Sequence, residues 1–141
     1  MPSRDVSSLM PLFALAGWTA LILALIAVRR IGAGLAGRVR PADFRFGESA
    51  VVPPDVCLPN RNYMNLLELP VLFYVAGLIA FVTGQTSPLQ SALAWAYVGL
   101  RVVHSLIHLS YNNVYHRLAA FALSNFVLLS LWLQVFWGLH G

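Results

Sequence analysis

Four long apolar segments dominate the sequence and limit what it can fold into. The first, residues 9–28, carries no charge and has about the 20 residues that a helix needs to cross ~30 Å of hydrocarbon. Residues 61–82, 89–111 and 118–139 are the other three segments. The chain is 59% hydrophobic and 10% charged, whereas a soluble domain is about 45–50% apolar and roughly 25% charged. We therefore predict an all-α integral membrane four-helix bundle, formed as a single four-span domain over residues 1–141.

The basic residues predict how the chain is oriented in the membrane. They gather in the connection 29–60 and at Arg61 and Arg117, whereas the connection between the second and third segments has none and the N-terminal segment has only Arg4 beside Asp5. Short basic loops stay on the cytoplasmic side, so we expect loop 29–60 to be cytoplasmic and both termini of this multi-pass protein to be non-cytoplasmic. The net charge of +4 then reflects topology. We expect a lipid bilayer and no nucleic acid as partner.

The third apolar segment contains a regular stripe of polar side chains. Its members follow one another at alternating intervals of four and three residues and therefore share one helix face: they are Tyr97, Arg101, His104, His108, Tyr111 and Tyr115. Ionisable groups at membrane depth are costly and usually face protein or a water-filled cavity, so the stripe marks a candidate site. The alternative interpretation is that these side chains only hydrogen-bond neighbouring helices together.

The second apolar segment carries a matching stripe of Arg61, Asn65 and Glu68. We expect Asn60 to cap this helix and Pro70 to bend it beside Glu68, because proline cannot donate to the carbonyl of the preceding turn. A buried arginine cannot lose its proton and needs an acceptor. We therefore predict a structural ion pair between Glu68 and Arg101. Beyond this segment, Gly84 ends the helix, and Ser87 caps the next helix, which begins with proline.

The polar residues nearest the cytoplasmic surface predict a cationic, donor-rich pocket. Such a pocket suits an anionic ligand bearing carboxylates, with a lipophilic second substrate in the apolar grooves; an Arg or Tyr beside a thiol also favours the thiolate. A weaker alternative is a metal or haem site at His104 and His108, with Glu68 as a third metal ligand, although we assign no metal site. The expected pocket residues are Arg29, Arg30, Arg61, Asn65, His104, His108, Tyr111, Tyr115 and Arg117.

At these stripes the sequence resembles the MAPEG family, the membrane-associated proteins of eicosanoid and glutathione metabolism. The matching motifs are Arg61-x-x-x-Asn65-x-x-Glu68 followed by Pro70, Arg101-x-x-His104, and Arg117 before the fourth segment. The resemblance implies a homotrimer that binds glutathione between subunits near the cytoplasmic face. It implies that Asn65, Glu68, His104 and Arg117 contact glutathione, that Arg117 stabilises its thiolate, and that Arg29 or Arg30 matches the arginine closing the family's first helix.

The chain departs from the prostaglandin synthase branch of that family at Met64, His108, Leu118 and Phe121, where ligand-contacting residues stand in that branch. Two functions follow as expectations. The first is a trimeric membrane enzyme that conjugates glutathione, or a related thiol, to lipophilic electrophiles, in the manner of a glutathione transferase or peroxidase. In it Arg117 is catalytic, and Arg61, Asn65, Glu68 and His104 position the ligand. The second, which the departures favour, is a non-catalytic lipid- or ligand-binding membrane protein on the same scaffold.

Overall fold

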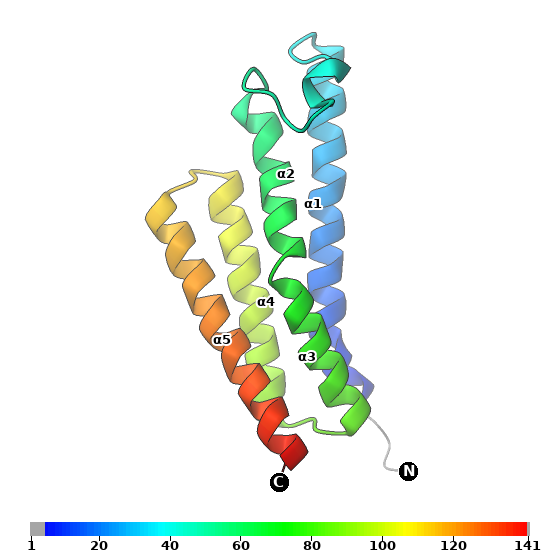
Figure 1. Cartoon of the computed structure of the whole chain (residues 1–141), viewed down its shortest axis with the longest axis vertical. Helices are drawn as coiled ribbons and strands as arrows, with labels where there is room; N and C mark the ends of the chain where they lie inside the picture. Colours follow the sequence, from blue (N-terminus) through cyan, green and yellow to red (C-terminus); the bar gives the residue numbers. More distant parts are fainter. Residues whose placement is uncertain (1–4, 141) are drawn as a thin grey trace.

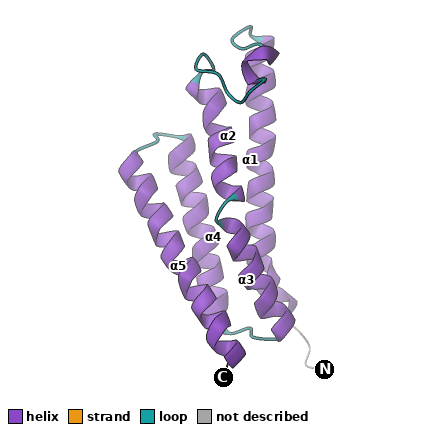
Figure 2. Ribbon diagram, in the orientation of Figure 1, coloured by secondary structure: helices purple, strands orange, loops and turns teal. Residues whose placement is uncertain are grey.

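The computed structural model describes residues 5–140 and shows a bundle of long helices (Figure 1); Arg4 lies outside the described residues. A short 3-10 turn, η1 (Val6–Leu9), leads into α1 (Met10–Leu35), and a second one, η2 (Pro41–Phe44), lies in the connection that follows. The remaining helices are α2 (Pro54–Leu67), α3 (Pro70–Thr83), α4 (Pro88–Leu109) and α5 (Val114–His140). Figure 2 shows helices joined by loops throughout the described part of the chain.

Four helical stretches in the described residues are long and apolar enough to cross a membrane. They are Val6–Leu35, Pro54–Thr83, Pro88–Leu109 and Val114–His140. Large apolar side chains such as Leu21, Val28 and Phe126 point outward and stay exposed, while Leu15, Phe73 and Tyr97 are fully buried in the core. An apolar exterior around a packed interior is what a bilayer requires. The predicted all-α membrane bundle is therefore confirmed.

The second span is broken in its middle, as Pro70 predicts. Helix α2 ends at Leu67, Glu68 has a non-helical ψ of −97°, and α3 starts with Pro70 at its first position. Figure 1 shows the change of direction where α2 meets α3. The local signals at the far end are also confirmed: Gly84 closes α3 at a positive φ of 73°, and the Ser87 hydroxyl accepts a hydrogen bond from the Gln90 N–H at 3.1 Å.

The helices are longer than the sequence alone indicates at the end where α1 and α2 are joined. Helix α1 runs through Arg29 and Arg30 to Leu35, and α2 begins at Pro54. Asn60 therefore lies inside α2, where Pro53 rather than Asn60 is the N-cap, and Pro59 is helical as well. The loop expected over residues 29–60 is correspondingly shorter. Proline at the first helical position loses no intrahelical bond, and Pro59 removes only one.

A small second core explains why these extra turns are helical. Ala33 at the end of α1 packs with Val56 and Cys57 at the start of α2 and with Val39 and Val52 from the connection. This burial offsets the hydrogen bond that Pro59 cannot make.

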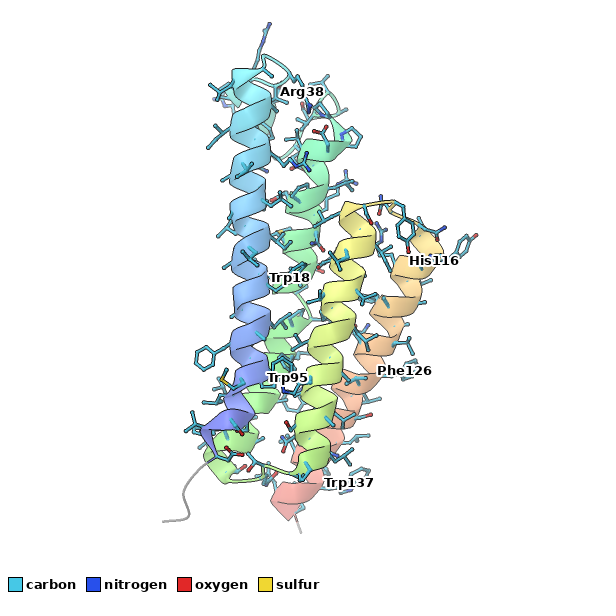
Figure 3. The ribbon with its side chains drawn as sticks, turned by 180° about the vertical axis from the view of Figure 1, so that it is seen from behind. Trp18, Arg38, Trp95, His116, Phe126 and Trp137 are labelled. Carbon is cyan, nitrogen blue, oxygen red and sulfur yellow. The ribbon has the colours of Figure 1, made fainter. Side chains whose placement is uncertain are left out.

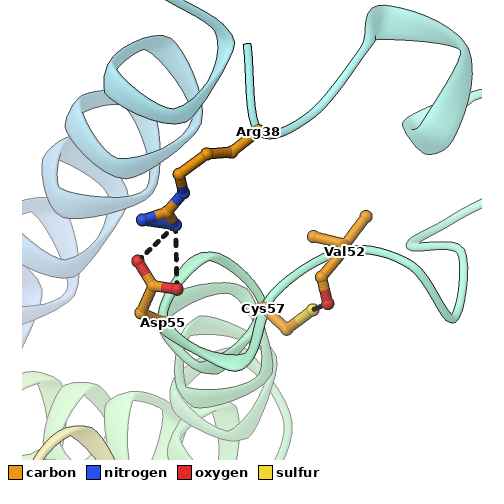
Figure 4. A network of polar contacts seen from close by, with 4 residues as sticks. All are labelled: Arg38, Val52, Asp55 and Cys57. Carbon is orange, nitrogen blue, oxygen red and sulfur yellow. Dashed lines mark hydrogen bonds and ion pairs between the residues drawn. The ribbon is translucent and has the colours of Figure 1, made fainter. Parts of the chain in front are cut away.

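Polar contacts hold the connection against the ends of both helices. The Arg38 guanidinium donates to both carboxylate oxygens of Asp55, at 2.9 and 2.7 Å, and the Cys57 thiol donates to the Val52 carbonyl at 3.4 Å (Figure 4). Arg30 forms an ion pair with Glu48 at 3.1 Å. Figure 3 places Arg38 at the opposite end of the molecule from Trp137, so the connection caps one end of the bundle.

Candidate functional site

Arg117 lies in the first turn of α5, where the start of the helix fixes its direction. The Asn113 side chain accepts hydrogen bonds from the N–H groups of Tyr115 at 3.0 Å and His116 at 3.1 Å, so Asn113 caps the helix that the sequence places a few residues later. The Arg117 guanidinium donates to Nδ1 of His108 and to Oδ1 of Asn112, both at 2.7 Å. These two acceptors engage one guanidinium nitrogen and orient the group.

The contact between Arg117 and His108 gives the histidine a different role from the expected one. A guanidinium can only donate, so Nδ1 of His108 has to be unprotonated to accept from it. The His108 ring also stacks on His104, with ring centroids 6.0 Å apart. His108 therefore positions Arg117 within the chain, which is the interhelical hydrogen bonding given above as the alternative to a ligand contact.

His104 is almost fully buried on the same face of α4, and its Nδ1 atom has no hydrogen-bond partner among the described residues. Its ring lies 6.0 Å from that of Phe121 on α5. A buried polar atom normally has a partner in the protein, in water or in a ligand. His104 therefore has an Nδ1 atom that is unpaired in the described structure, and its ring stacks on His108, which contacts Arg117.

The predicted ion pair between Glu68 and Arg101 is not formed. Arg101 is fully buried and donates to the backbone carbonyl of Asn65. Its guanidinium carbon lies over the Phe121 ring, 5.6 Å from the ring centroid. The break at Pro70 explains the choice of partner, because the carbonyl of Asn65 receives no hydrogen bond from the N–H of residue 69 in the described structure. The freed backbone acceptor engages one guanidinium nitrogen of Arg101, and the Glu68 side chain stays exposed.

A cavity of about 240 Å³ joins three of the predicted site residues. Asn65 comes from α2, His104 from α4 and Arg117 from α5, so the stripes on different helices do converge on one hollow. The rest of the lining is apolar and consists of Val114, Leu118 and Phe121. The hollow therefore combines polar and cationic groups from three helices with apolar side chains that flank Arg117 on α5.

The other predicted site residues do not line this hollow in a single chain. Tyr111 and Tyr115 are 61% and 81% exposed, because α4 ends at Leu109 and the stripe loses its helical register beyond it; the Tyr111 hydroxyl instead contacts Nδ1 of His116 at 3.0 Å. Arg29, Arg61 and Glu68 are exposed as well. Arg30 is engaged by Glu48 and lies over the Phe44 ring at 4.6 Å.

Several residues of the site were not identified from the sequence. Asn112 shares Arg117 with His108 and adopts the left-handed conformation, with φ of 49°. The pair Asn112-Asn113 before an apolar segment is the signal that could have identified it, since asparagine tolerates this conformation and also caps helices. Asn62 and Ser105 are fully buried polar residues without a partner in the described structure, and nothing in the two stripes singles them out.

The metal alternative lacks a ligand set in this geometry. Within residues 5–140, no three side chains of His, Cys, Asp or Glu are grouped closely enough to hold a metal ion. Glu68 does not join the two histidines, and Nδ1 of His108 already accepts from Arg117.

Comparison with known proteins gives one result that covers nearly the whole chain. The sequence model of the MAPEG family matches residues 8–137, which include most of each of the four spans and every lining residue of the hollow. No curated protein and no solved structure matched the sequence.

Proposed function

Because this chain belongs to the MAPEG family, we propose that it is a membrane-bound enzyme that conjugates glutathione, or a related thiol, to lipophilic electrophiles. The family includes glutathione transferases and peroxidases as well as other members. The observation that carries the proposal is the convergence of Asn65, His104 and Arg117 on one hollow whose other lining residues are apolar.

Arg117 is the proposed catalytic residue. One of its guanidinium nitrogens is held by His108 and Asn112, and the other N–H groups have no hydrogen-bond partner among the described residues. A fixed cation with free donors stabilises a thiolate through charge and hydrogen bonding. The thiol proton leaves to solvent, the sulfur forms a bond to the electrophilic carbon, and the leaving group departs with the bonding electrons.

Asn65 and His104 are the proposed positioning contacts for the thiol ligand. The amide of Asn65 offers both donors and an acceptor, and Nδ1 of His104 is buried without a partner in the described structure. Glutathione carries carboxylates and amides, which match these groups. Leu118 and Phe121 are the apolar lining residues that would contact the lipophilic substrate.

We propose that the working site is completed in a homotrimer. The hollow of one chain, about 240 Å³, is smaller than the ~300–1,000 Å³ of pockets that enclose drug-sized ligands. Glu68, which the family resemblance assigns to the ligand, and Arg61, which we expect to help position it, are exposed rather than part of the lining of the hollow. A neighbouring protomer that covers this face would enlarge the site and bury those side chains.

The proposed orientation puts the hollow near the cytoplasmic surface. Figure 1 shows the α4–α5 turn at the same end of the molecule as the connection between α1 and α2. Arg29, Arg40 and Arg45 lie in that connection or beside it, and Arg117 follows the turn. This end carries the basic loops that stay inside.

The direct test is glutathione conjugation to a nitro-activated aryl chloride by the purified protein in lipid nanodiscs, followed by titration calorimetry with glutathione. We expect activity in the native protein and its loss in Arg117→Ala. Arg45→Ala is the matched control, because Arg45 lies in the connection and its guanidinium contacts the Phe46 ring instead of the hollow. His108→Phe is unsuitable as a control, because His108 holds Arg117. Equal activity in the two arginine variants, or none in the native protein, would contradict the proposal.

The second candidate function is non-catalytic binding of a lipid or another lipophilic ligand on the same scaffold. The observation in its favour is that Leu118 and Phe121 make much of the hollow apolar. Under this alternative, lipids raise the unfolding temperature of the purified protein, glutathione leaves it unchanged, and calorimetry detects no thiol binding.

A further inference from the structure

A second cavity, of about 300 Å³, opens at the other end of the bundle from Arg117. Its lining comes from η1, α1, α3, α4 and α5 and from the loop between α3 and α4. In Figure 1 this loop lies at the end where both termini lie, opposite the turn between α4 and α5. The cavity is therefore separate from the proposed glutathione site, and it is enclosed by one chain.

Small side chains on two helices create the space. Gly77 on α3 is contacted by Leu12 of α1 so closely that an added Cβ would lie 2.7 Å from a Leu12 methyl carbon. Ala80 on α3 and Ala94 on α4 are buried and line the same cavity. Larger residues in place of Ala80 or Ala94 would fill the volume, and one in place of Gly77 would displace Leu12. An apolar cavity of about 150 Å³ holds a benzene ring, so this one accommodates a body about twice that size.

The floor and the mouth of this cavity differ in chemistry. Phe73 and Leu131, both almost fully buried, form part of the floor. The mouth carries hydroxyl and amide side chains and one carboxylate, which are Asp5, Ser7, Ser8, Thr86, Ser87, Gln90 and Ser91. An apolar floor under a polar mouth is the usual pattern of a site for an amphiphilic small molecule.

The charge at the mouth of the cavity determines which polar group of an amphiphilic ligand can bind there. Asp5 is the charged residue among the described lining residues. The Ser7 N–H donates to its carboxylate at 2.9 Å, and the hydrogen bonds from Ser7 hold the Asp5 pKa below its ordinary value, so the group is ionised at neutral pH. A carboxylate attracts a cationic head group and repels an anionic one.

We propose that this cavity binds a lipid-soluble amine, with an apolar body of about two rings on the Phe73 floor and its ammonium group at the Asp5 mouth. Asp5 and the neighbouring serine hydroxyls accept the ammonium hydrogens. The site opens at the membrane face away from Arg117, so its ligand arrives without passing through the thiol site.

The test compares three compounds with the same body, 1-naphthylmethylamine, 1-naphthylmethanol and 1-naphthoic acid, by titration calorimetry on the whole protein in uncharged-lipid nanodiscs. We expect the amine to bind about two- to fivefold more tightly than the alcohol, as an exposed ion pair allows, and the acid to bind most weakly. Asp5→Asn should remove the preference of the amine over the alcohol.

Two variants locate the binding in the cavity. Ala94→Phe fills the floor and Ser91→Trp closes the mouth, and each should weaken amine binding at least tenfold. Because Ser91 is only half-buried, Ser91→Trp should disturb folding less than Ala94→Phe, and it provides the test if Ala94→Phe does not fold. Ala92→Trp is the matched control on the exposed face of α4, and it should bind the amine as the native protein does, as should Arg117→Ala. Undiminished affinity in the folded cavity variants, acid binding as tight as amine binding, or no binding at all would overturn the proposal.

Discussion

The change in unfolding free energy on substituting Glu68 or Arg101 distinguishes two arrangements in the middle of the bundle: an ion pair between these residues, or Arg101 bound to a backbone carbonyl. The pattern of charges along the second and third spans predicts an ion pair between them. In the structure, Arg101 instead donates to the backbone carbonyl of Asn65, and the Glu68 side chain is exposed. The substitution Glu68→Gln removes the charge while keeping the size and shape of the side chain, so it probes the pair with little other disturbance.

The two accounts differ by several kcal/mol. Breaking a buried pair by removing one partner costs about 3–5 kcal/mol. An exposed side chain outside such a pair costs within about 0.5 kcal/mol, and we expect that small value for Glu68→Gln. Arg101→Met loses a hydrogen bond from a charged donor, about 1.5–3 kcal/mol. Part of that loss is offset, because the Nε and Nη1 atoms of Arg101 are buried without partners in the described structure.

A double-mutant cycle measures the coupling directly. The free energies of unfolding of the native protein, Glu68→Gln, Arg101→Met and the double variant are compared in one detergent, with glutathione absent. We expect a coupling energy below about 1 kcal/mol, because the two charges attract each other without forming a hydrogen bond or an ion pair in the described structure. A coupling of about 3 kcal/mol or more would show that the two charges form a pair after all, and it would refute the assignment of Arg101 to the Asn65 carbonyl.

Three further predictions concern the proposed site and one helix end. In Arg117→Ala, kcat/KM for conjugation should fall about 10- to 100-fold at pH 6.5, because a nearby cation lowers a thiol pKa of roughly 8.5 by about 1–3 units and the thiolate fraction rises by that factor; the deficit should shrink as the pH rises past 9, and a pH-independent ratio would contradict the thiolate role. Asn112→Gly keeps the left-handed backbone but removes one acceptor of Arg117, so kcat/KM should fall roughly fivefold, the equivalent of about 1 kcal/mol, with the unfolding temperature unchanged. Ser87→Ala removes the cap of α4 and should lower the free energy of unfolding by about 1 kcal/mol, measured by chemical unfolding against Thr86→Ala as control.

The parts of the fold that local physics decides could be predicted from the sequence. The lengths of the apolar segments determine the four spans, Pro70 alone dictates the break, and Ser87 and Gly84 mark helix ends. The limits of α1 and α2 could not be predicted, because they depend on the packing of Ala33 against residues from the connection and from α2. That packing joins residues far apart in the sequence, which periodicity along one helix does not register.

In the candidate site, too, the features set by local sequence could be predicted, and those set by tertiary contacts could not. Helical spacing correctly places His104 and Asn65 on inward faces, and together with Arg117 they line one hollow. The partner of Arg101 could not be read from side-chain patterns, because it is a backbone carbonyl that becomes available only where the helix breaks. His108 is similar: its contact with Arg117 depends on where α5 starts, and the Asn113 cap sets that start.

The exposure of Glu68 bears on the assembly of the protein. Because α2 starts at Pro54 and α3 ends at Thr83, Glu68 lies near the middle of the second span. An ionisable side chain at such a depth is costly against lipid and usually faces protein or water. Arg101 forms no hydrogen bond or ion pair with it in the described structure, so water or a group from outside the chain has to solvate the carboxylate. In the proposed trimer a neighbouring protomer covers this face, and Glu68 is then free to hold the amino group of a thiol ligand between subunits, a role that a permanent ion pair with Arg101 would oppose.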